Sequence, residues 1–197
     1  MKILSLALAP VLALALAVPA AAERISLNTI SNYLNSLTTV TAPFTQVNAD
    51  GSIQTGTVFI HRPGRVRFEY NGDNSLVLAS GGQVAVFDGR SNQPPQQYPL
   101  DRTPLSIILA PNVNLAQANM VTGHTERDNA TVVTAQDPAN PQYGNIQMVF
   151  TGGPTQLRQW VVTDDTGTRT TVILGELSQG GAIPPSRFSI PNEIDRR

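Results

Sequence analysis

The sequence predicts a mainly β fold: one antiparallel sheet of roughly ten strands that curls toward a barrel, with two short helices against its concave side. Fifteen glycines and fifteen prolines separate short segments rich in Val, Ile, Thr and Phe, a pattern typical of strands joined by turns. No internal repeat interrupts this pattern. Two short amphipathic segments must bury their apolar faces, and the concave side of a curled sheet offers the surface for this.

Residues 1–22 are predicted to be a cleavable signal peptide. Lys2 supplies the positive charge, the apolar segment 3–18 follows, and Ala20 and Ala22 form the small-x-small pattern of a cleavage site. The alternative is a membrane anchor, but the apolar segment is shorter than the ~20 residues that span a bilayer. Cleavage removes 22 of 197 residues, so that residues 23–197 remain as one domain of 175 residues.

Composition excludes several classes of protein. Without Lys2, the 13 basic residues fall to 12, all arginine, against 14 acidic residues, a net charge of −2. A near-neutral chain gives no electrostatic reason to expect nucleic-acid binding. The absence of cysteine excludes disulfides, thiolate metal sites, cysteine nucleophiles and a lipid-modified N-terminal cysteine. We therefore expect the protein to be free in solution after cleavage, and we also expect it to be a monomer.

The first helix is expected directly after the signal peptide. Leu27, Ile30, Leu34 and Leu37 recur at three- and four-residue steps, the spacing of one helix face. Ser26 is the predicted N-cap.

The strands follow from alternation and turn residues. Asp50-Gly51 predicts a hairpin turn, and the segment 65–70 alternates, with Val66, Phe68 and Tyr70 on one face of a half-buried strand. Segment 89–97 is polar and is predicted to be a loop. Strands are expected at 44–47, 53–61, 65–70, 76–79, 84–88, 120–126, 131–135, 146–150, 157–163 and 170–174.

A second short helix is expected after Thr103, which we predict to cap it, with Pro104 in its first turn. Leu105, Ile108 and Leu109 form its apolar stripe.

Catalytic and metal-binding motifs are missing from the sequence. His61 and His124 are isolated, and neither has the spacing of a metal-binding pair on one element. There is no G-x-S-x-G segment, and Gly152-Gly153-Pro154 lacks the Lys-Ser/Thr of a phosphate-binding loop. We expect no enzyme activity, no metal and no cofactor.

Arg62 is the unusual charged residue. Strand parity places it on the same face as Val58 and Ile60, so an arginine would end an apolar face. A buried charge needs acceptors, and backbone carbonyls at a helix end are good candidates. The alternative is that Pro63-Gly64 turns the side chain outward into solvent, and parity alone does not decide between the two.

A series of short motifs points to a known family. In order, the chain carries Phe44-Thr45-Gln46, Asp50-Gly51, Gly56-Thr57, Arg62-Pro63, Arg67-Phe68-Glu69-Tyr70, Leu76-Val77, Val86-Phe87-Asp88, Pro99-Leu100, Thr103-Pro104-Leu105 and Phe188-Ser189-Ile190-Pro191. With the signal peptide and the first helix, this order resembles the LolA family of periplasmic outer-membrane lipoprotein carrier proteins. The resemblance extends over nearly all of 23–197 and is densest from 44 to 109.

The resemblance implies a half-open, eleven-stranded antiparallel barrel with a short-helix lid over an apolar cavity. That cavity would take the acyl chains of lipoproteins released by an ATP-driven exporter of the inner membrane. The carrier would then pass them to an acceptor on the outer membrane. The functional arginine of the family falls on Arg62, which would hold the lid closed through hydrogen bonds to lid backbone.

The resemblance and the strand parities together define the expected site. Residues expected to line the acyl-chain cavity are Val58, Ile60, Val66, Phe68, Tyr70 and Leu76. Residues expected in the lid are Leu34, Leu105, Ile108 and Leu109.

The chain departs from the family pattern at several positions, and other functions stay open. His61 replaces a usual lysine, Gly81 a usual aspartate, and Ala85 a common aromatic residue. Aromatic residues make up only 6% of the chain, so aliphatic side chains would line most of the cavity. The alternatives are a lipid-binding or envelope-stress-sensing module on the same barrel, a secreted hydrolase, and a structural envelope protein.

Overall fold

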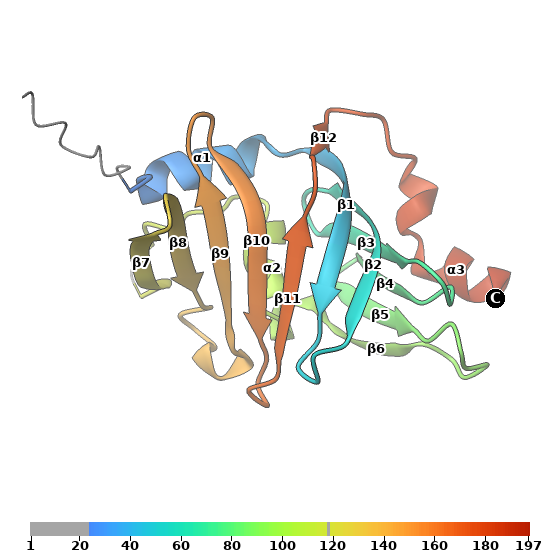
Figure 1. The fold of residues 1–197 in the computed structure, drawn as a ribbon. Helices are drawn as coiled ribbons and strands as arrows, with labels where there is room; N and C mark the ends of the chain where they lie inside the picture. The colour runs from blue at the N-terminus through green and yellow to red at the C-terminus, as the bar shows by residue number, and fades with distance from the viewer. Residues whose placement is uncertain (1–23, 118) are drawn as a thin grey trace, which may run out of the picture.

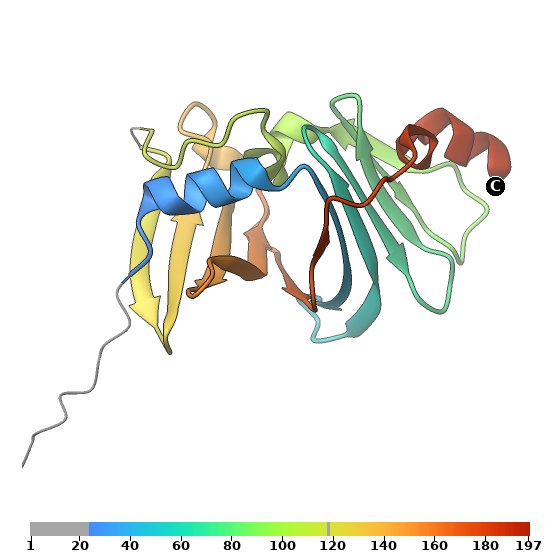
Figure 2. The same cartoon turned by 90° about the horizontal axis from the view of Figure 1, so that it is seen from above.

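The computed structural model describes residues 24–117 and 119–197, so the predicted signal peptide lies outside the described residues. One antiparallel sheet of twelve strands dominates the fold, in the order β6-β5-β4-β3-β2-β1-β11-β10-β9-β8-β7, with β12 paired to β1. The sheet is strongly curved but not closed, because β6 and β7 end the path (Figures 1 and 2). The predicted half-open antiparallel barrel is confirmed.

The strands mostly follow the predicted segments. They are β1 (Thr39–Val47), β2 (Ile53–His61), β3 (Arg65–Tyr70), β4 (Leu76–Ser80), β5 (Gln83–Phe87), β6 (Gln96–Pro99), β7 (Val121–Arg127), β8 (Ala130–Ala135), β9 (Asn145–Thr151), β10 (Gln156–Thr163), β11 (Arg169–Leu174) and β12 (Ser178–Gln179). The prediction of a loop at 89–97 was wrong at its end, where β6 begins. This strand is polar and contains a proline, and among the described residues it pairs only with β5, as an edge strand can.

Three α-helices and three 3-10 turns complete the described part of the chain. They are α1 (Leu27–Ser36), η1 (Leu100–Arg102), α2 (Leu105–Leu109), η2 (Pro141–Tyr143), η3 (Pro185–Phe188) and α3 (Ile190–Arg196). None of them is long and apolar enough to cross a membrane. Figures 1 and 2 show α1 across the half of the sheet that contains β7 to β10, whereas α3 lies at the opposite end beside β4.

Helix α1 begins where the sequence predicts. Ser26 is the N-cap, and its Oγ accepts a hydrogen bond from the Thr29 amide at 3.1 Å. Ile30 and Leu34 are buried on the side that faces the sheet. The predicted cap of α2 was wrong: the hydroxyl of Thr103 donates to the carbonyl of Leu100 in the preceding turn at 2.8 Å, and Pro104 is the N-cap without a side-chain bond.

The sheet has an apolar core on each face. The larger one, on the concave face, includes the buried side chains of α1, of α2 and of Val113 and Leu115. The smaller one lies on the convex face beneath the C-terminal segment, residues 184–197. Its buried members are Leu76, Leu78, Ala85, Phe87, Phe188 and Ile190.

One predicted cavity residue, Leu76, lies on the other face of the sheet. It was expected in the concave cavity, but it packs in the convex core, where 1% of its surface is exposed. In β4, Val77 and Ala79 face the concave core instead. Both faces of this strand are apolar, so alternation alone could not assign them.

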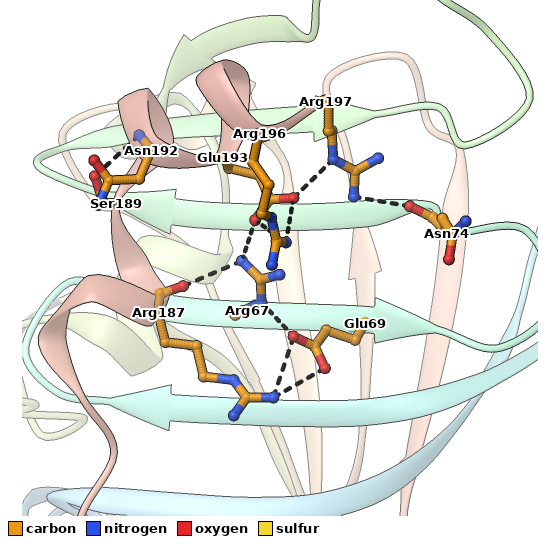
Figure 3. Close-up of polar contacts among 9 residues, drawn as sticks. All are labelled: Arg67, Glu69, Asn74, Arg187, Ser189, Asn192, Glu193, Arg196 and Arg197. Carbon is orange, nitrogen blue, oxygen red and sulfur yellow. Dashed lines mark hydrogen bonds and ion pairs between the residues drawn. The ribbon is translucent and has the colours of Figure 1, made fainter.

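The burial of Arg67 on the convex face is a second difference from the sequence prediction. The alternation of β3 predicted a strand half buried through its apolar face, yet Arg67 on the other face is only 5% exposed. The C-terminal segment covers it (Figure 3). Arg67 donates to Glu69 at 2.6 Å, to Glu193 at 3.0 Å and to the carbonyl of Arg187 at 3.1 Å. The segment is thus held to the sheet by a buried ion pair as well as by apolar contacts.

Glu193 is the centre of this cluster. Arg196 and Arg197 also donate to its carboxylate, at 2.7 and 2.8 Å (Figure 3). Burial by itself would raise the pKa of Glu193, but the hydrogen bonds from Arg196, Arg197 and Arg67 outweigh it and lower the pKa to about 2. The carboxylate therefore stays ionised at neutral pH.

Gly56 is required by the close approach of β2 to its neighbours. A Cβ at this position would lie 2.0 Å from the carbonyl oxygen of Glu69 and 2.7 Å from Cε1 of Phe44. Gly56→Ala should therefore lower the free energy of unfolding by about 2 kcal/mol or more, measured by chemical denaturation. Gly123→Ala on β7 is the matched control, since its nearest contact is Thr134 Oγ1 at 3.4 Å. Equal stability of the two variants would contradict the prediction.

Candidate functional site

Arg62 directly follows β2 and joins two helices. Its guanidinium donates to the carbonyl of Leu34 in α1 and to the carbonyl of Ala110, the C-cap of α2. A third bond, at 3.3 Å, reaches the side chain of Asn35. Of the two orientations left open by strand parity, the structure has the inward one.

The charge of Arg62 is balanced by dipoles rather than by an anion. Among residues 24–117 and 119–197, no carboxylate lies within ion-pair distance of it. The C-terminal ends of α1 and α2 both point their carbonyls at the guanidinium, where a helix carries partial negative charge. Burial lowers the pKa of Arg62 from its usual value. Such contacts can be broken without leaving a buried carboxylate unpaired.

Further hydrogen bonds connect α1 to the segment after α2. We call α1 and residues 105–115 together the lid. The side chain of Asn35 donates to the carbonyl of Val113 at 2.9 Å and accepts from its amide at 2.8 Å. Ser31 Oγ accepts from the amide of Leu115 at 3.0 Å. The amide of Gly64 donates to the carbonyl of Leu109 at 2.9 Å, so the turn beside Arg62 also holds the lid.

The lid packs its apolar side chains against the concave face. Leu34, Ile108 and Leu109 are buried in the concave core, and Leu105 packs against it. Of the residues expected to line a cavity, those buried in the same core are Val58, Ile60, Val66 and Phe68, with Tyr70 half-buried beside them. The structure thus brings all of the predicted lid and cavity residues together except Leu76.

Space remains at one end of the concave face. A pocket of about 630 Å³, here called the mouth pocket, lies between the start of the lid and the β10–β11 hairpin. Its apolar walls include Phe68, Val77, Val84, Trp160, Val162 and Val172. Its polar residues include Gln46, Tyr98, Arg102, Thr103, Asp164 and Asp165.

Tyr70 lies at the boundary between the apolar and polar parts of the mouth pocket. Its hydroxyl donates to Oε1 of Gln46 at 2.8 Å. Burial raises the pKa of Tyr70 to about 12, although the bond to Gln46 opposes the shift. The side chain is therefore a neutral hydrogen-bonding group at physiological pH.

The histidines do not form a metal site. Within the described ranges, no group of three or more His, Asp or Glu side chains could hold a metal ion. His61 packs edge-on against Phe188, with ring centroids 5.8 Å apart. His124 Nε2 is 2.9 Å from the carbonyl oxygen of Ile25. Both contacts are structural.

Sequence reasoning missed Asn35 and the mouth pocket. Asn35 lies one residue from the predicted apolar face of α1, and an isolated helical asparagine carries no signal of its bond to residue 113. Trp160 is the only tryptophan in the chain, which marks it as a candidate for a large apolar contact. That Trp160 and Arg102 line one pocket depends on the fold of the whole sheet.

Comparison of the sequence with known proteins identifies a family. The sequence model described as "Outer membrane lipoprotein carrier protein LolA" matches residues 35–191, from within α1 to the start of α3. An outer-membrane lipoprotein carrier protein from Chromohalobacter salexigens is 26% identical over 194 residues, which cover 92% of this chain and 91% of the relative.

Solved structures with a similar chain course include two proteins. A conserved protein from Thermus thermophilus aligns with a TM-score of 0.47 and 10% identity, over 82% of this chain and 89% of that protein. A LolA superfamily protein from Nitrosomonas europaea aligns with a TM-score of 0.46 and 8% identity, over 85% of this chain and 99% of that one.

Proposed function

This chain belongs to the LolA family of outer-membrane lipoprotein carrier proteins, and from that premise we propose that it carries acylated lipoproteins through the periplasm. It takes cargo from an ATP-driven exporter of the inner membrane and delivers it to an acceptor on the outer membrane. The observation that carries the proposal is an apolar concave face covered by a lid that Arg62 and a few other hydrogen bonds hold closed. The protein acts by binding, without a catalytic step.

The energetics of the cargo explain why such a lid is useful. Burial of lipid chains contributes about 0.8 kcal/mol per CH₂, so three chains with on the order of 45 such groups cost roughly 35 kcal/mol to take from a membrane. An energy-coupled donor must supply part of this, and an apolar cavity must recover much of the rest. In the empty carrier, lid side chains such as Leu34 and Ile108 cover the concave face in place of the cargo.

Opening the lid exposes the surface that would receive the acyl chains. Val58, Ile60 and Val66 lie in the concave core with the buried side chains of α1 and α2. Displacement of the helices would expose these aliphatic side chains together with Phe68. Arg62 is the proposed latch, because its one guanidinium bonds to a backbone carbonyl at the end of each helix.

The proposal predicts that acylated proteins accompany the carrier. The full chain is expressed with a C-terminal affinity tag, purified from the periplasmic fraction without detergent, and analysed by mass spectrometry for acylated cysteine peptides. We expect such peptides with the wild-type protein and more of them with Arg62→Leu, which should retain cargo. Arg127→Leu, an exposed arginine at the end of β7, is the control and should match the wild type. Absence of acylated peptides from every preparation would overturn the carrier function.

A further inference from the structure

The mouth pocket is open while the lid is closed. It is lined by Leu105 of the lid and by Thr103 and Pro104 just before it, but not by Leu34, Asn35 or Ala110, the residues that Arg62 contacts. The strand register places the mouth pocket and Arg62 at opposite ends of the strands. His61 pairs with Thr39 directly after α1, whereas the β10–β11 hairpin at the mouth lies at the other end (Figure 1). A ligand could therefore occupy the pocket with Arg62 still bonded.

The size of the mouth pocket matches one acyl chain. An apolar cavity of about 150 Å³ holds benzene, so one carbon takes about 25 Å³ and a chain of about 16 carbons takes about 400 Å³. The pocket holds about 630 Å³. One chain fits, and three chains of that length do not. The triacylated cargo of the proposed function requires an open lid, but a single-chain lipid does not.

The polar rim carries both signs of charge. Arg102 is exposed, and within the described ranges no carboxylate pairs with it. Asp164 and Asp165, on the turn between β10 and β11, line the same pocket. Burial would raise the pKa of Asp164, but hydrogen bonds from Thr166 and Thr168 outweigh it and lower the pKa, so the carboxylate is ionised at neutral pH. One cation and two anions at the rim complement a headgroup that itself carries both charges.

We propose that the closed protein binds one zwitterionic single-chain phospholipid in the mouth pocket, with the acyl chain against Trp160 and Phe68. The phosphate lies toward Arg102, and the ammonium lies toward Asp164 and Asp165. The biological meaning of this inference rests on the proposed function. A lipid chain would first contact the protein at the mouth pocket and not at Arg62. The binding itself is measured without any lipoprotein.

Trp160 reports on the pocket directly, because it is the only tryptophan of the chain and lines the pocket wall. Lysophosphatidylethanolamine with a brominated acyl chain is titrated into the mature protein below its micelle concentration, and quenching of Trp160 fluorescence is followed. We expect saturable quenching. We also expect an affinity about 2- to 5-fold higher than for the brominated lysophosphatidylglycerol of equal chain length, which has no ammonium group. No saturable quenching would overturn the proposal.

Two variants test the pocket and its rim. Asp165→Lys should remove or reverse the preference for the zwitterion, whereas Glu176→Lys, the same charge change at an exposed site outside the pocket, should leave it intact. Val162→Phe narrows the pocket and should lower the binding affinity for both lipids at least tenfold. If Val162→Phe does not fold, the rim variant Asp165→Lys and its control Glu176→Lys still decide. An unchanged preference in Asp165→Lys would exclude the proposed headgroup contacts.

Hydrogen exchange tests whether the lid stays closed. With saturating lysophosphatidylethanolamine, amide exchange in α1 and in residues 105–115 should equal that of the free protein. Faster exchange there would show that the lipid opens the lid and would overturn binding to the closed form. Lipoprotein recovery without lysolipid quenching would contradict this inference alone. Lysolipid quenching without lipoprotein recovery would contradict the carrier function alone.

Discussion

Arg62→Leu should load lipoprotein but fail to hand it to the acceptor. Under the proposed mechanism, release from the wild type is favoured because the empty carrier regains the bonds from Arg62 to the carbonyls of Leu34 and Ala110. A hydrogen bond to a charged group contributes about 1.5–3 kcal/mol net, so two such bonds favour the closed empty form by about 3 kcal/mol or more. Their loss shifts the balance toward bound cargo by about 100-fold or more.

The measurement is a transfer assay. A preformed complex of carrier and radiolabelled lipoprotein is mixed with acceptor-containing vesicles, and the label in each fraction is followed with time. Arg127→Leu should transfer like the wild type, and circular dichroism should show that Arg62→Leu keeps its sheet. Normal transfer by a folded Arg62→Leu variant would remove Arg62 from the mechanism.

Glu193→Gln should cause the largest loss of stability among single changes at the C-terminal segment. The amide cannot balance the charge of Arg67, whose side chain is only 6% exposed and would keep only Glu69 as an anionic partner. Removal of one partner from a buried ion pair costs about 3–5 kcal/mol. Asp195→Asn is the matched control, since Asp195 is exposed on the same helix and forms no ion pair within the described ranges. Urea denaturation of both variants measures the difference.

The pH dependence of stability provides an independent check on Glu193. Its folded pKa of about 2 is below the unfolded value of about 4.3, so ionised Glu193 stabilises the folded state above about pH 4.3. This contribution, on the order of 3 kcal/mol, is lost as the pH falls from about 5 toward 2. Wild type and Glu193→Gln should therefore converge in stability at low pH and differ most at neutral pH. A constant difference from about pH 7 to pH 3 would contradict the assignment.

Loss of this ion pair should act first on the C-terminal segment. Phe188 and Ile190 supply its apolar contact with the convex core. The guanidinium of Arg187 stacks over Phe59, with Cζ 3.8 Å from the centroid of the ring. Replacement of Arg67 and Glu193 together by Met and Leu should restore much of the stability, because an apolar pair of similar volume often equals a buried ion pair. The double variant separates the charge effect from disruption of the packing.

Features that depend on neighbouring residues were predictable from sequence. Ser26 caps α1 because an N-cap needs only its own turn. Asp50-Gly51 forms the hairpin turn, since glycine at residue 51 takes a φ of +81°. Alternation placed Val66 and Phe68 together on one apolar face, and the structure has both in the concave core. The predicted signal peptide stays a prediction.

Features that depend on distant parts of the chain could not be predicted from the sequence. The face of Leu76, the burial of Arg67 and the acceptors of Arg62 each depend on a partner far away in sequence: Arg67 bonds to Glu193, 126 residues on, and Arg62 to Ala110, 48 residues on. Local periodicity states that a face is apolar or polar, but not what covers it. The sequence by itself therefore determined ten of the twelve strands, the two helices of the lid and the unusual arginine, but not β6 or β12. Only the tertiary structure decided that two helix ends meet at Arg62, and that a buried ion pair ties the C-terminal segment to the sheet.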